Sequence, residues 1–557
     1  MRKFRRRTVY KFAGLSFVFL LIISILGSAF ILWQIYLQIN DLSKSSVSLD
    51  SNNLGKLQTK VNLLKLTTSN PIMAVGSSIL ITPGSYRDFT TVINSSASVL
   101  NHLSRFEKEN NQTYHSLVEL IPVVQRTMPE INALLGSLSH FHLGGILSPL
   151  DHRLIAIREE SKKYEIAAES LAPLVDIFPS LVGSNSPRKY LVAFQNSAEA
   201  RGSGGILGAY AILSVKKGKI KFTQFGSNAS LQHRQDIPIK MPPEFVRLYN
   251  DDPGIWQNAN ISAHFPYGAK IWLALWERQF NEKLDGVLTF DPNALSYLLK
   301  ATGAVTVNRS EIDFENVVTI TLSDVYKKYE LDNNARKKFL MNVVKSVASR
   351  IEDANIPFWK ILFNLVTPFN EHRILLYSTN QLEQREIEKS SISGAISRQP
   401  DNVYRLIIQN ISGNKMDYYL RRVVKIESLQ CLPIKKTKVT FSLTNSANPQ
   451  WKLPSYVAGR LDLNRTEGLN NSYGTRAILL APVGARIVEA KNLQTNKKFG
   501  FFVRERTHPG IGVELDIAAN QTQSFSVTFA GGAGKIGSYV QPLVDTQKNF
   551  IADRCSK

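Results

Sequence analysis

A dense cluster of polar residues and glycines occupies positions 195–205, directly after an apolar stretch that predicts a strand. Its sequence is Gln-Asn-Ser-Ala-Glu-Ala-Arg-Gly-Ser-Gly-Gly. Arginine offers forked donors to a phosphate, and glycines let neighbouring backbone N–H groups converge on an anion. The Gly-Lys-Ser/Thr end of a nucleotide-binding P-loop is absent, and the glycines lack dinucleotide-binding spacing. Two interpretations follow: a phosphate-binding loop, or a glycine-rich connection between strands with Glu199 and Arg201 as a surface ion pair. Composition alone favours the second.

The elements that must position this cluster alternate between strands and helices. Apolar patterning predicts strands at 190–195, 206–215, 220–225 and 284–290, and helices at 267–280 and 334–351. Asp291 followed by Pro292 predicts the start of a short helix, with the aspartate as its N-cap. This alternation predicts an α/β domain over residues 186–430.

The flanking regions have different patterns. Residues 41–185 carry apolar side chains at helical spacing, which predicts a helical stalk or bundle, and Pro173 is expected to end or kink its last helix. Residues 431–557 contain short alternating strands separated by glycine and asparagine, which predicts a β-sandwich. The fold class expected from the whole chain is therefore multidomain: helical stalk, central α/β domain and C-terminal sandwich.

The N-terminal sequence predicts a membrane anchor. Residues 1–11 form a basic tail without an acid, and residues 12–33 are uncharged and long enough, at about 20 residues, to span a bilayer. The basic tail predicts a cytoplasmic N-terminus, with the rest of the chain outside a single-pass cell membrane protein. A cleaved signal peptide is the alternative, but the apolar run continues past the small residues Gly27-Ser28-Ala29.

Composition limits the partners. The net charge of +22 suits anionic lipids, phosphates or wall polymers, although excess lysine also serves solubility. No zinc spacing, basic zipper or RNA-binding signature occurs, so no nucleic-acid partner is expected. Cys431 and Cys555 are the two cysteines, and they form either one disulfide or two unrelated thiols. The oligomeric state is left open.

Tyr190–Tyr210 resembles the signature of an uncharacterised bacterial envelope family, domain of unknown function 4012. That signature is a strand, then Gln-Asn-x-x-Glu-x-Arg-x-Ser/Thr-Gly-Gly, then a glycine and an aromatic residue. The residues that match here are Gln195, Asn196, Glu199, Arg201, Ser203, Gly204, Gly205, Gly208 and Tyr210. Leu284–Leu295 and Ala301–Val305 resemble its second block. Asn410, Asn414-Lys415 and Asp417-Tyr418 resemble its closing motif.

That family is similar in layout to the LytR-CpsA-Psr phosphotransferases, which move glycopolymers from a polyprenyl-pyrophosphate carrier onto the cell wall with magnesium. The resemblance implies a LytR-CpsA-Psr-like α/β domain in which Arg201 and Arg336 face a pyrophosphate. The ligand-binding residues it implies are Arg201, Gln195, Asn196, Glu199, Ser203, Gly204, Gly205 and Arg336.

The chain departs from the enzymes where they carry acids. Gly204-Gly205 replaces an acid of the loop, and Gly226–Ala229 replaces an Arg-Asp pair. Mg²⁺ is therefore a cofactor that the resemblance implies without identified ligands, and the catalytic residues stay unassigned. Asp236, Asp251 and Asp252 are nearby acids, although such acids more often form turns or caps.

An aromatic cluster at 256–276, with Trp256, Trp272 and Trp276, could stack on sugars but more often such residues form a core. The function expected from the sequence is a membrane-anchored cell-envelope protein that binds a polyprenyl-(pyro)phosphate-linked glycan. As an enzyme it would transfer that glycan to the wall. The alternative is a non-catalytic envelope scaffold or wall-polymer-binding protein.

Overall fold

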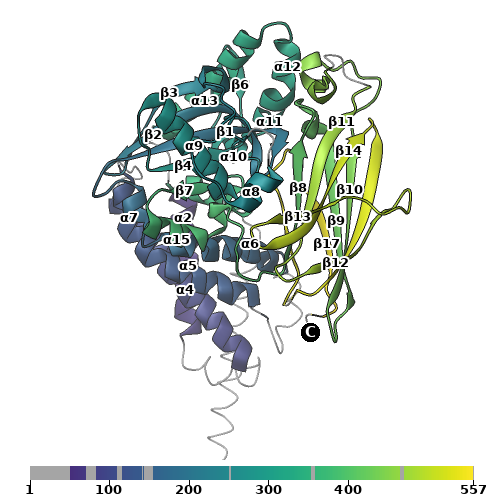
Figure 1. Ribbon diagram of the computed structural model, residues 1–557. Coiled ribbons are helices and arrows are strands. Elements are labelled where there is room, and N and C mark those ends of the chain that lie inside the picture. Colours follow the sequence, from purple (N-terminus) through teal and green to yellow (C-terminus); the bar gives the residue numbers. More distant parts are fainter. Residues whose placement is uncertain are drawn as a thin grey trace, which may run out of the picture. The chain divides into compact units, whose positions relative to one another are not determined.

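The computed structural model describes residues 51–69, 83–109, 116–140, 142, 155–249, 253–352, 358–464, 470–532 and 534–555. The chain separates into two compact units, one built mainly from residues up to Phe178 and the other from Pro179 to the C-terminus (Figure 1). No helix among the described residues is long and apolar enough to cross a membrane. The predicted anchor at 12–33 and basic tail at 1–11 lie outside the described residues.

The first unit is helical. Its long helices are α2 (Ser51–Thr68), α4 (Pro83–Glu109), α5 (Ile121–His140) and α6 (Ile155–Leu171). Successive helices pack against one another, α2 on α4, α4 on α5 and α5 on α6. The α-helix α6 ends at Leu171, and a short 3-10 turn containing Pro173 follows, as expected because proline lacks the N–H that would continue the helix.

The second unit begins with a five-stranded sheet of order β3-β2-β1-β4-β7. Its strands are β1 (Arg188–Arg201), β2 (Gly204–Lys216), β3 (Lys219–Ser227), β4 (Gly286–Phe290) and β7 (Leu376–Ser378). The central strand β1 pairs antiparallel with β2 and parallel with β4. Most residues of β1 and β2 are buried, because helices cover both faces of the sheet.

Each face of this sheet has its own core. Leu191 and Ala193 of β1 pack with Trp272 and other apolar residues of α9 (Phe265–Phe280). On the other face, Phe290 packs against a cluster that includes α10 (Pro292–Thr302) and α13 (Asn333–Glu352). Asp291 caps α10 as predicted, because its Oδ1 accepts from the backbone N–H of Ala294 at 2.7 Å.

Two further five-stranded sheets share one hydrophobic core, to which both contribute side chains. One has the order β12-β15-β10-β9-β17 and the other the order β13-β14-β11-β8-β16 (Figure 1). The first sheet contains β9 (Leu420–Gln430), β10 (Lys436–Asn445), β12 (Arg486–Asn492), β15 (Gln521–Ala530) and β17 (Lys548–Ala552). The second contains β8 (Val403–Asn410), β11 (Tyr473–Leu480), β13 (Phe501–Glu505), β14 (His508–Ile517) and β16 (Gly537–Tyr539).

The start of this sandwich differs from the sequence-based boundary. The strands β8 and β9 fall within residues 186–430, the range expected for the α/β domain, yet they pair with β11 and β10 of the sandwich. Alternating residues mark a strand but do not say which neighbour it joins, since pairing depends on chain-distant partners. The sandwich sheets therefore begin at Val403.

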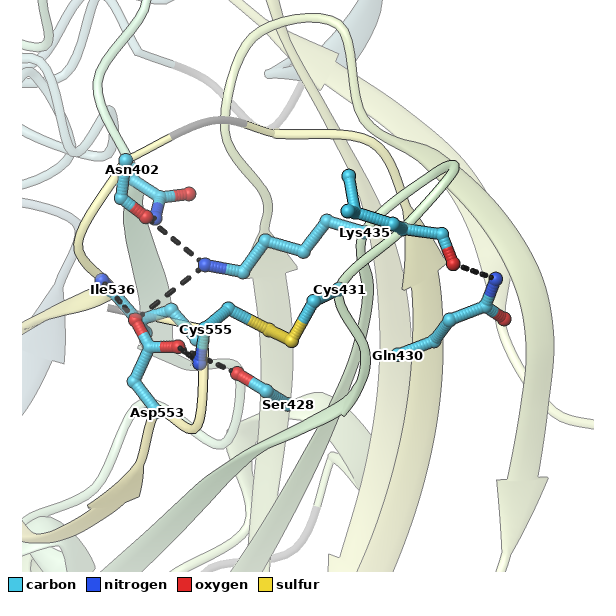
Figure 2. Close-up of a disulfide and its surroundings, with 10 residues drawn as sticks. Asn402, Ser428, Gln430, Cys431, Lys435, Ile536, Asp553 and Cys555 are labelled. Carbon is cyan, nitrogen blue, oxygen red and sulfur yellow. Dashed lines mark hydrogen bonds and ion pairs between the residues drawn. A yellow bond between two sulfur atoms is a disulfide. The ribbon is translucent and has the colours of Figure 1, made fainter. Parts of the chain in front are cut away.

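A disulfide joins Cys431 to Cys555 across a sequence separation of 124 residues, which settles the pairing that the sequence left open. Figure 2 shows it where the chain leaves β9 and the terminal strand β17 ends. The carboxylate of Asp553 accepts hydrogen bonds from Ser428 Oγ at 2.7 Å and from the backbone N–H of Ile536 at 3.1 Å. Because β17 pairs in parallel with β9, the disulfide holds the final strand at the edge of its sheet.

Candidate functional site

The polar cluster of the sequence lies at the end of β1, and its two charged residues are buried rather than exposed. Arg201 and Glu199 have side-chain exposures of 9% and 6%, and Arg201 Nη2 donates to Glu199 Oε1 at 3.0 Å. The other guanidinium nitrogens donate to Asn258 Oδ1 at 3.1 Å and to the backbone oxygen of Ala200 at 2.9 Å. Arg201 thus has a protein partner on each of its three nitrogens.

The glycine-rich segment is a tight hairpin turn between β1 and β2, in which Arg201 pairs with Gly204. A Cβ at Gly202 would lie 2.1 Å from the backbone oxygen of Ile261, and one at Gly205 would lie 2.1 Å from that of Asn196. The N–H of Ser203 donates to the backbone oxygen of Asn260. The glycines permit close packing of backbone on backbone, so the strand-connection interpretation describes this turn better than a phosphate cradle does.

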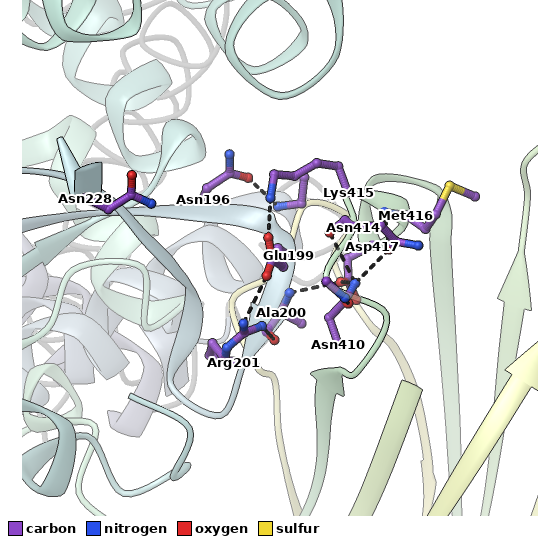
Figure 3. Close-up of polar contacts among 12 residues, drawn as sticks. Asn196, Glu199, Ala200, Arg201, Asn228, Asn410, Asn414, Lys415, Met416 and Asp417 are labelled. Atoms are coloured by element: carbon purple, nitrogen blue, oxygen red, sulfur yellow. Dashed lines mark hydrogen bonds and ion pairs between the residues drawn. The ribbon is translucent and has the colours of Figure 1, made fainter. Parts of the chain in front are cut away.

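A second segment completes the ion-pair cluster. Lys415 Nζ contacts Glu199 Oε2, so this buried carboxylate has two cationic partners (Figure 3). The neighbouring Asp417 accepts from the backbone N–H of Ala200 at 2.9 Å, from Asn410 Nδ2 at 2.7 Å and from the Tyr473 hydroxyl. These contacts join β1 of the α/β sheet to the loop between β8 and β9 of the sandwich.

Sequence reasoning did not place Lys415 and Asp417 in the site. Both belong to the closing motif of the resemblance, and Figure 3 shows that motif directly beside the end of β1. The signal that could have found them is that two separated motifs of one signature often meet in space. No local pattern in the sequence specifies the contact between Ala200 and Asp417, because the two residues are 217 positions apart.

Burial and neighbouring charges shift the pKa values of Glu199, Lys415 and Asp417. Burial alone raises the pKa of Glu199, but Lys415 and Arg201 outweigh burial and hold that pKa below its usual value. The pKa of the Lys415 ammonium is raised, because Glu199 opposes the effect of burial. Burial raises the pKa of Asp417 despite its three hydrogen bonds. Glu199 is therefore a fixed anion between two cations, an arrangement suited to stabilising the junction.

Arg336 lies near the same junction but does not face Arg201. Its guanidinium carbon lies 3.8 Å from the ring centre of Tyr456 and 5.1 Å from that of Tyr326. Its Nη2 donates to Asn333 Oδ1 at 2.6 Å. Asn196 reaches the same aromatic pair, donating from Nδ2 to the Tyr326 hydroxyl at 2.6 Å. The structure thus brings Asn196 and Arg336 to one tyrosine, while Arg201 is held by Glu199.

A groove lies between the sheet and α13, and encloses about 620 Å³ including the space open to solvent. Its walls are mainly apolar: Phe194 and Phe290 from the strands, Leu295 from α10, and Leu340, Met341 and Val344 from α13. Lys337, Leu340, Met341 and Val344 recur at intervals of three and four, so one helix face lines the groove. We refer to this site as the α13 groove.

One polar side chain of the α13 groove has unused donors. Lys337 is half-buried, and within the part of the chain that the structure describes it makes no ion pair. Gln195 also borders the groove, but it pairs with Leu207 of the core on the α9 face of the sheet, and its amide lies beside Gly204 of the turn. The groove's carboxylate, Asp291, is paired with Arg373 at 2.7 Å. An ammonium therefore remains beside an apolar cavity, which suits a ligand with an apolar part and an anionic group.

Metal ligands and aromatic sugar-binding residues were the remaining candidates. No group of three or more His, Cys, Asp or Glu side chains gathers among the described residues, and Asp236 pairs with Arg278 at 2.8 Å. Asp251 and Asp252 lie outside the described residues.

The aromatic cluster is core, because Trp256, Trp272 and Trp276 are 2%, 0% and 0% exposed. Gly226 lies under the Tyr210 ring, where a Cβ would meet Tyr210 Cζ at 2.4 Å.

Comparison with known proteins adds one result to this geometry. Residues 185–326 match the family described as Protein of unknown function (DUF4012). The match begins just before β1 and includes the Gln195–Gly205 cluster, so the resemblance to an uncharacterised family is confirmed over this segment. The likeness to the LytR-CpsA-Psr phosphotransferases stays a prediction.

The other comparisons assign no activity. A search of curated proteins finds no match. Among solved structures, the crystal structure of protein gbs0355 from Streptococcus agalactiae has 16% sequence identity and a TM-score of 0.25. That similarity covers 37% of this chain and 74% of the other, and the score is too low to bear on the fold.

Proposed function

We propose that the α/β domain binds a lipid-linked anion in the α13 groove, in the form of a polyprenyl-(pyro)phosphate-linked glycan. The observation that carries the proposal is the combination of mainly apolar groove walls with the Lys337 ammonium, which makes no ion pair among the described residues. The apolar walls offer burial worth about 25 cal/mol per Å² to a prenyl chain. The Lys337 ammonium offers charge and hydrogen bonding to its phosphate.

The proposal changes the roles expected from the sequence. Lys337 is the ligand-binding residue, whereas Gln195, Asn196, Glu199, Arg201 and the glycine turn hold the end of β1 in place. Arg336, stacked on Tyr456, supports the same end of the groove. The environment of Arg201 favours this division because Glu199, Asn258 and Ala200 use its donors.

The wider setting follows the sequence-based hypothesis. A helix at 12–33 would anchor the protein in the cell membrane, with the groove on the extracytoplasmic side where such lipids expose their glycans. An enzyme of this kind would pass the glycan to the cell wall with Mg²⁺. A non-catalytic envelope protein would use the groove for binding alone, and the absence of acids aligned with the enzymes' catalytic pair favours binding.

The test is a titration of the full chain with farnesyl pyrophosphate, compared with farnesol and with inorganic pyrophosphate. Lys337→Gln removes the ammonium that lines the groove, and Lys338→Gln is the matched control, since it removes the same charge from an exposed position one residue along the helix. We expect Lys337→Gln to weaken farnesyl pyrophosphate binding about 10-fold while farnesol binding is unchanged.

Two outcomes would refute the proposal. Equal weakening by the two variants would show that net charge, rather than the groove, governs binding. Full binding by Met341→Trp would show that the lipid lies elsewhere, because an indole at this position should fill much of the cavity. Retained thermal stability of each variant shows that a lost affinity is not lost folding.

A further inference from the structure

The outer face of the sheet β12-β15-β10-β9-β17 carries a ladder of hydroxyl groups. Along β10 and β15 the side chains alternate, with Val439, Phe441 and Leu443 of β10 pointing into the core. The side chains between them point outward and oppose hydroxyl residues of β15, giving the pairs Thr440–Ser526, Ser442–Ser524 and Thr444–Thr522. Two of these pairs are joined by hydrogen bonds of 2.7 Å between their hydroxyl groups.

Lysines surround this hydroxyl ladder. The outward residues of the same sheet include five lysines, which are Lys425, Lys436, Lys438, Lys491 and Lys548, and two glutamates, Glu427 and Glu489. Lys491 pairs with Glu489 at 2.7 Å. Within the described chain, Lys425, Lys436, Lys438 and Lys548 make no ion pair or side-chain hydrogen bond. The face therefore combines neutral donors and acceptors at its centre with an excess of lysines over glutamates around them.

The composition of the face distinguishes between classes of anionic partner. Single-stranded nucleic acids bind where aromatic rings stack on bases, but the ladder has no aromatic residue and Phe550 lies on the edge strand β17. Membrane-binding surfaces insert apolar side chains between lipid headgroups. The exposed apolar side chains Leu429 and Phe550 lie on β9 and β17, away from the ladder, and the ladder pairs contain none. Hydroxyl groups suit a partner that is itself rich in hydroxyls, because each can both donate and accept a hydrogen bond.

We infer that this face binds a linear anionic polysaccharide, laid along β10 and β15. Outward side chains on one strand recur about every 6.8 Å, so successive hydroxyl pairs form a regular row for an extended polymer. The hydroxyl ladder hydrogen-bonds the sugar hydroxyls, and the surrounding lysines pair with the acidic groups. The inference stands apart from the α13 groove, since it uses a different sheet and different residues.

The experiment is calorimetric titration of the full chain with polygalacturonate, at about 50 and 200 mM salt, with neutral dextran as the uncharged comparison. The charge variant is Lys425→Gln with Lys438→Gln. Its matched control is Lys219→Gln with Lys240→Gln, which removes two exposed lysines elsewhere. The hydroxyl variant is Thr440→Val with Ser442→Ala, which keeps the strand and both lysines.

We expect the charge variant to weaken polygalacturonate binding about 10-fold at the lower salt, and the control pair to weaken it less than about 2-fold. The hydroxyl variant should weaken binding without reducing its dependence on salt. Equal effects of the two lysine pairs would overturn the inference, and so would unchanged binding by the hydroxyl variant. Tighter binding to single-stranded DNA or to phosphatidylglycerol vesicles than to polygalacturonate would overturn it as well.

Discussion

Glutamine in place of Glu199 should strongly destabilise the second unit. Glu199 is the carboxylate between Arg201 and Lys415, whose side chains are 9% and 6% exposed. The substitution preserves the shape of the side chain and removes its charge, so two buried cations lose their compensating anion. Removal of one partner from a buried ion pair costs about 3–5 kcal/mol, because the remaining charge is left without compensation.

The structure also predicts that substitution of Lys415 destabilises the protein less than substitution of Glu199. Lys415→Met leaves Glu199 paired with Arg201, a neutral arrangement, so its cost should be nearer 2 kcal/mol. In the double variant only the charge of Arg201 stays uncompensated. Its cost should therefore fall below the sum of the single costs, with a coupling of about 0.5–3 kcal/mol.

The assay is urea denaturation followed by tryptophan fluorescence, since Trp256, Trp272 and Trp276 are buried within the same unit. The pH dependence provides a second measurement. The folded pKa of Glu199 lies below its ordinary value of 4.5, so its stabilisation is present above that value and is lost as pH falls through the folded pKa. The difference between the wild-type protein and Glu199→Gln should therefore shrink under acid conditions.

A cost below about 1 kcal/mol for Glu199→Gln would refute the reasoning, since it would place the pair in solvent. Equal costs for Glu199→Gln and Lys415→Met would refute the asymmetry. A difference that grows as pH falls would contradict the direction of the Glu199 pKa.

Three further predictions concern the turn, the disulfide and the groove. Gly202→Ala should destabilise the protein by about 1–3 kcal/mol or more, because its Cβ would lie 2.1 Å from the Ile261 backbone. Gly208→Ala should cost much less, because the nearest atom to its Cβ is 3.6 Å away. Thermal unfolding of both variants measures the difference. Cys431→Ser with Cys555→Ser should cost about 2–5 kcal/mol by opening a loop of 124 residues, and an unchanged urea midpoint would contradict this. Met341→Trp should abolish farnesyl pyrophosphate binding with little loss of stability, as calorimetry can check.

Local signals in the sequence predicted individual elements well. The strand at 190–195 and the helices at 267–280 and 334–351 correspond to β1, α9 and α13, because apolar periodicity reflects which side of an element is buried. The cap of α10 could be predicted because Asp291 and Pro292 act within one helical turn. The domain boundary could not be predicted, because the membership of β8 and β9 in the sandwich depends on pairing with β11 and β10, which are distant in the chain.

In the site too, the sequence predicted the local features and missed those that depend on distant residues. The sequence found Glu199 and Arg201 as a pair and favoured a connection between strands over a phosphate loop, but it expected a surface pair. Burial of that pair depends on Lys415, which approaches from 216 positions away. No local pattern reveals such a neighbour, since the energetic cost of an unpaired buried charge is felt only after the chain has folded.

By itself, the sequence determined the net charge, the element types and the motifs matched by an uncharacterised family, since these depend on residues close together in the chain. Only the tertiary structure decided that Cys431 joins Cys555, that protein oxygens accept the hydrogen bonds of Arg201, and that Lys337 lines an apolar groove without an ion pair among the described residues. A side chain's availability for a ligand depends on what the rest of the fold places against it, and that is a property of packing.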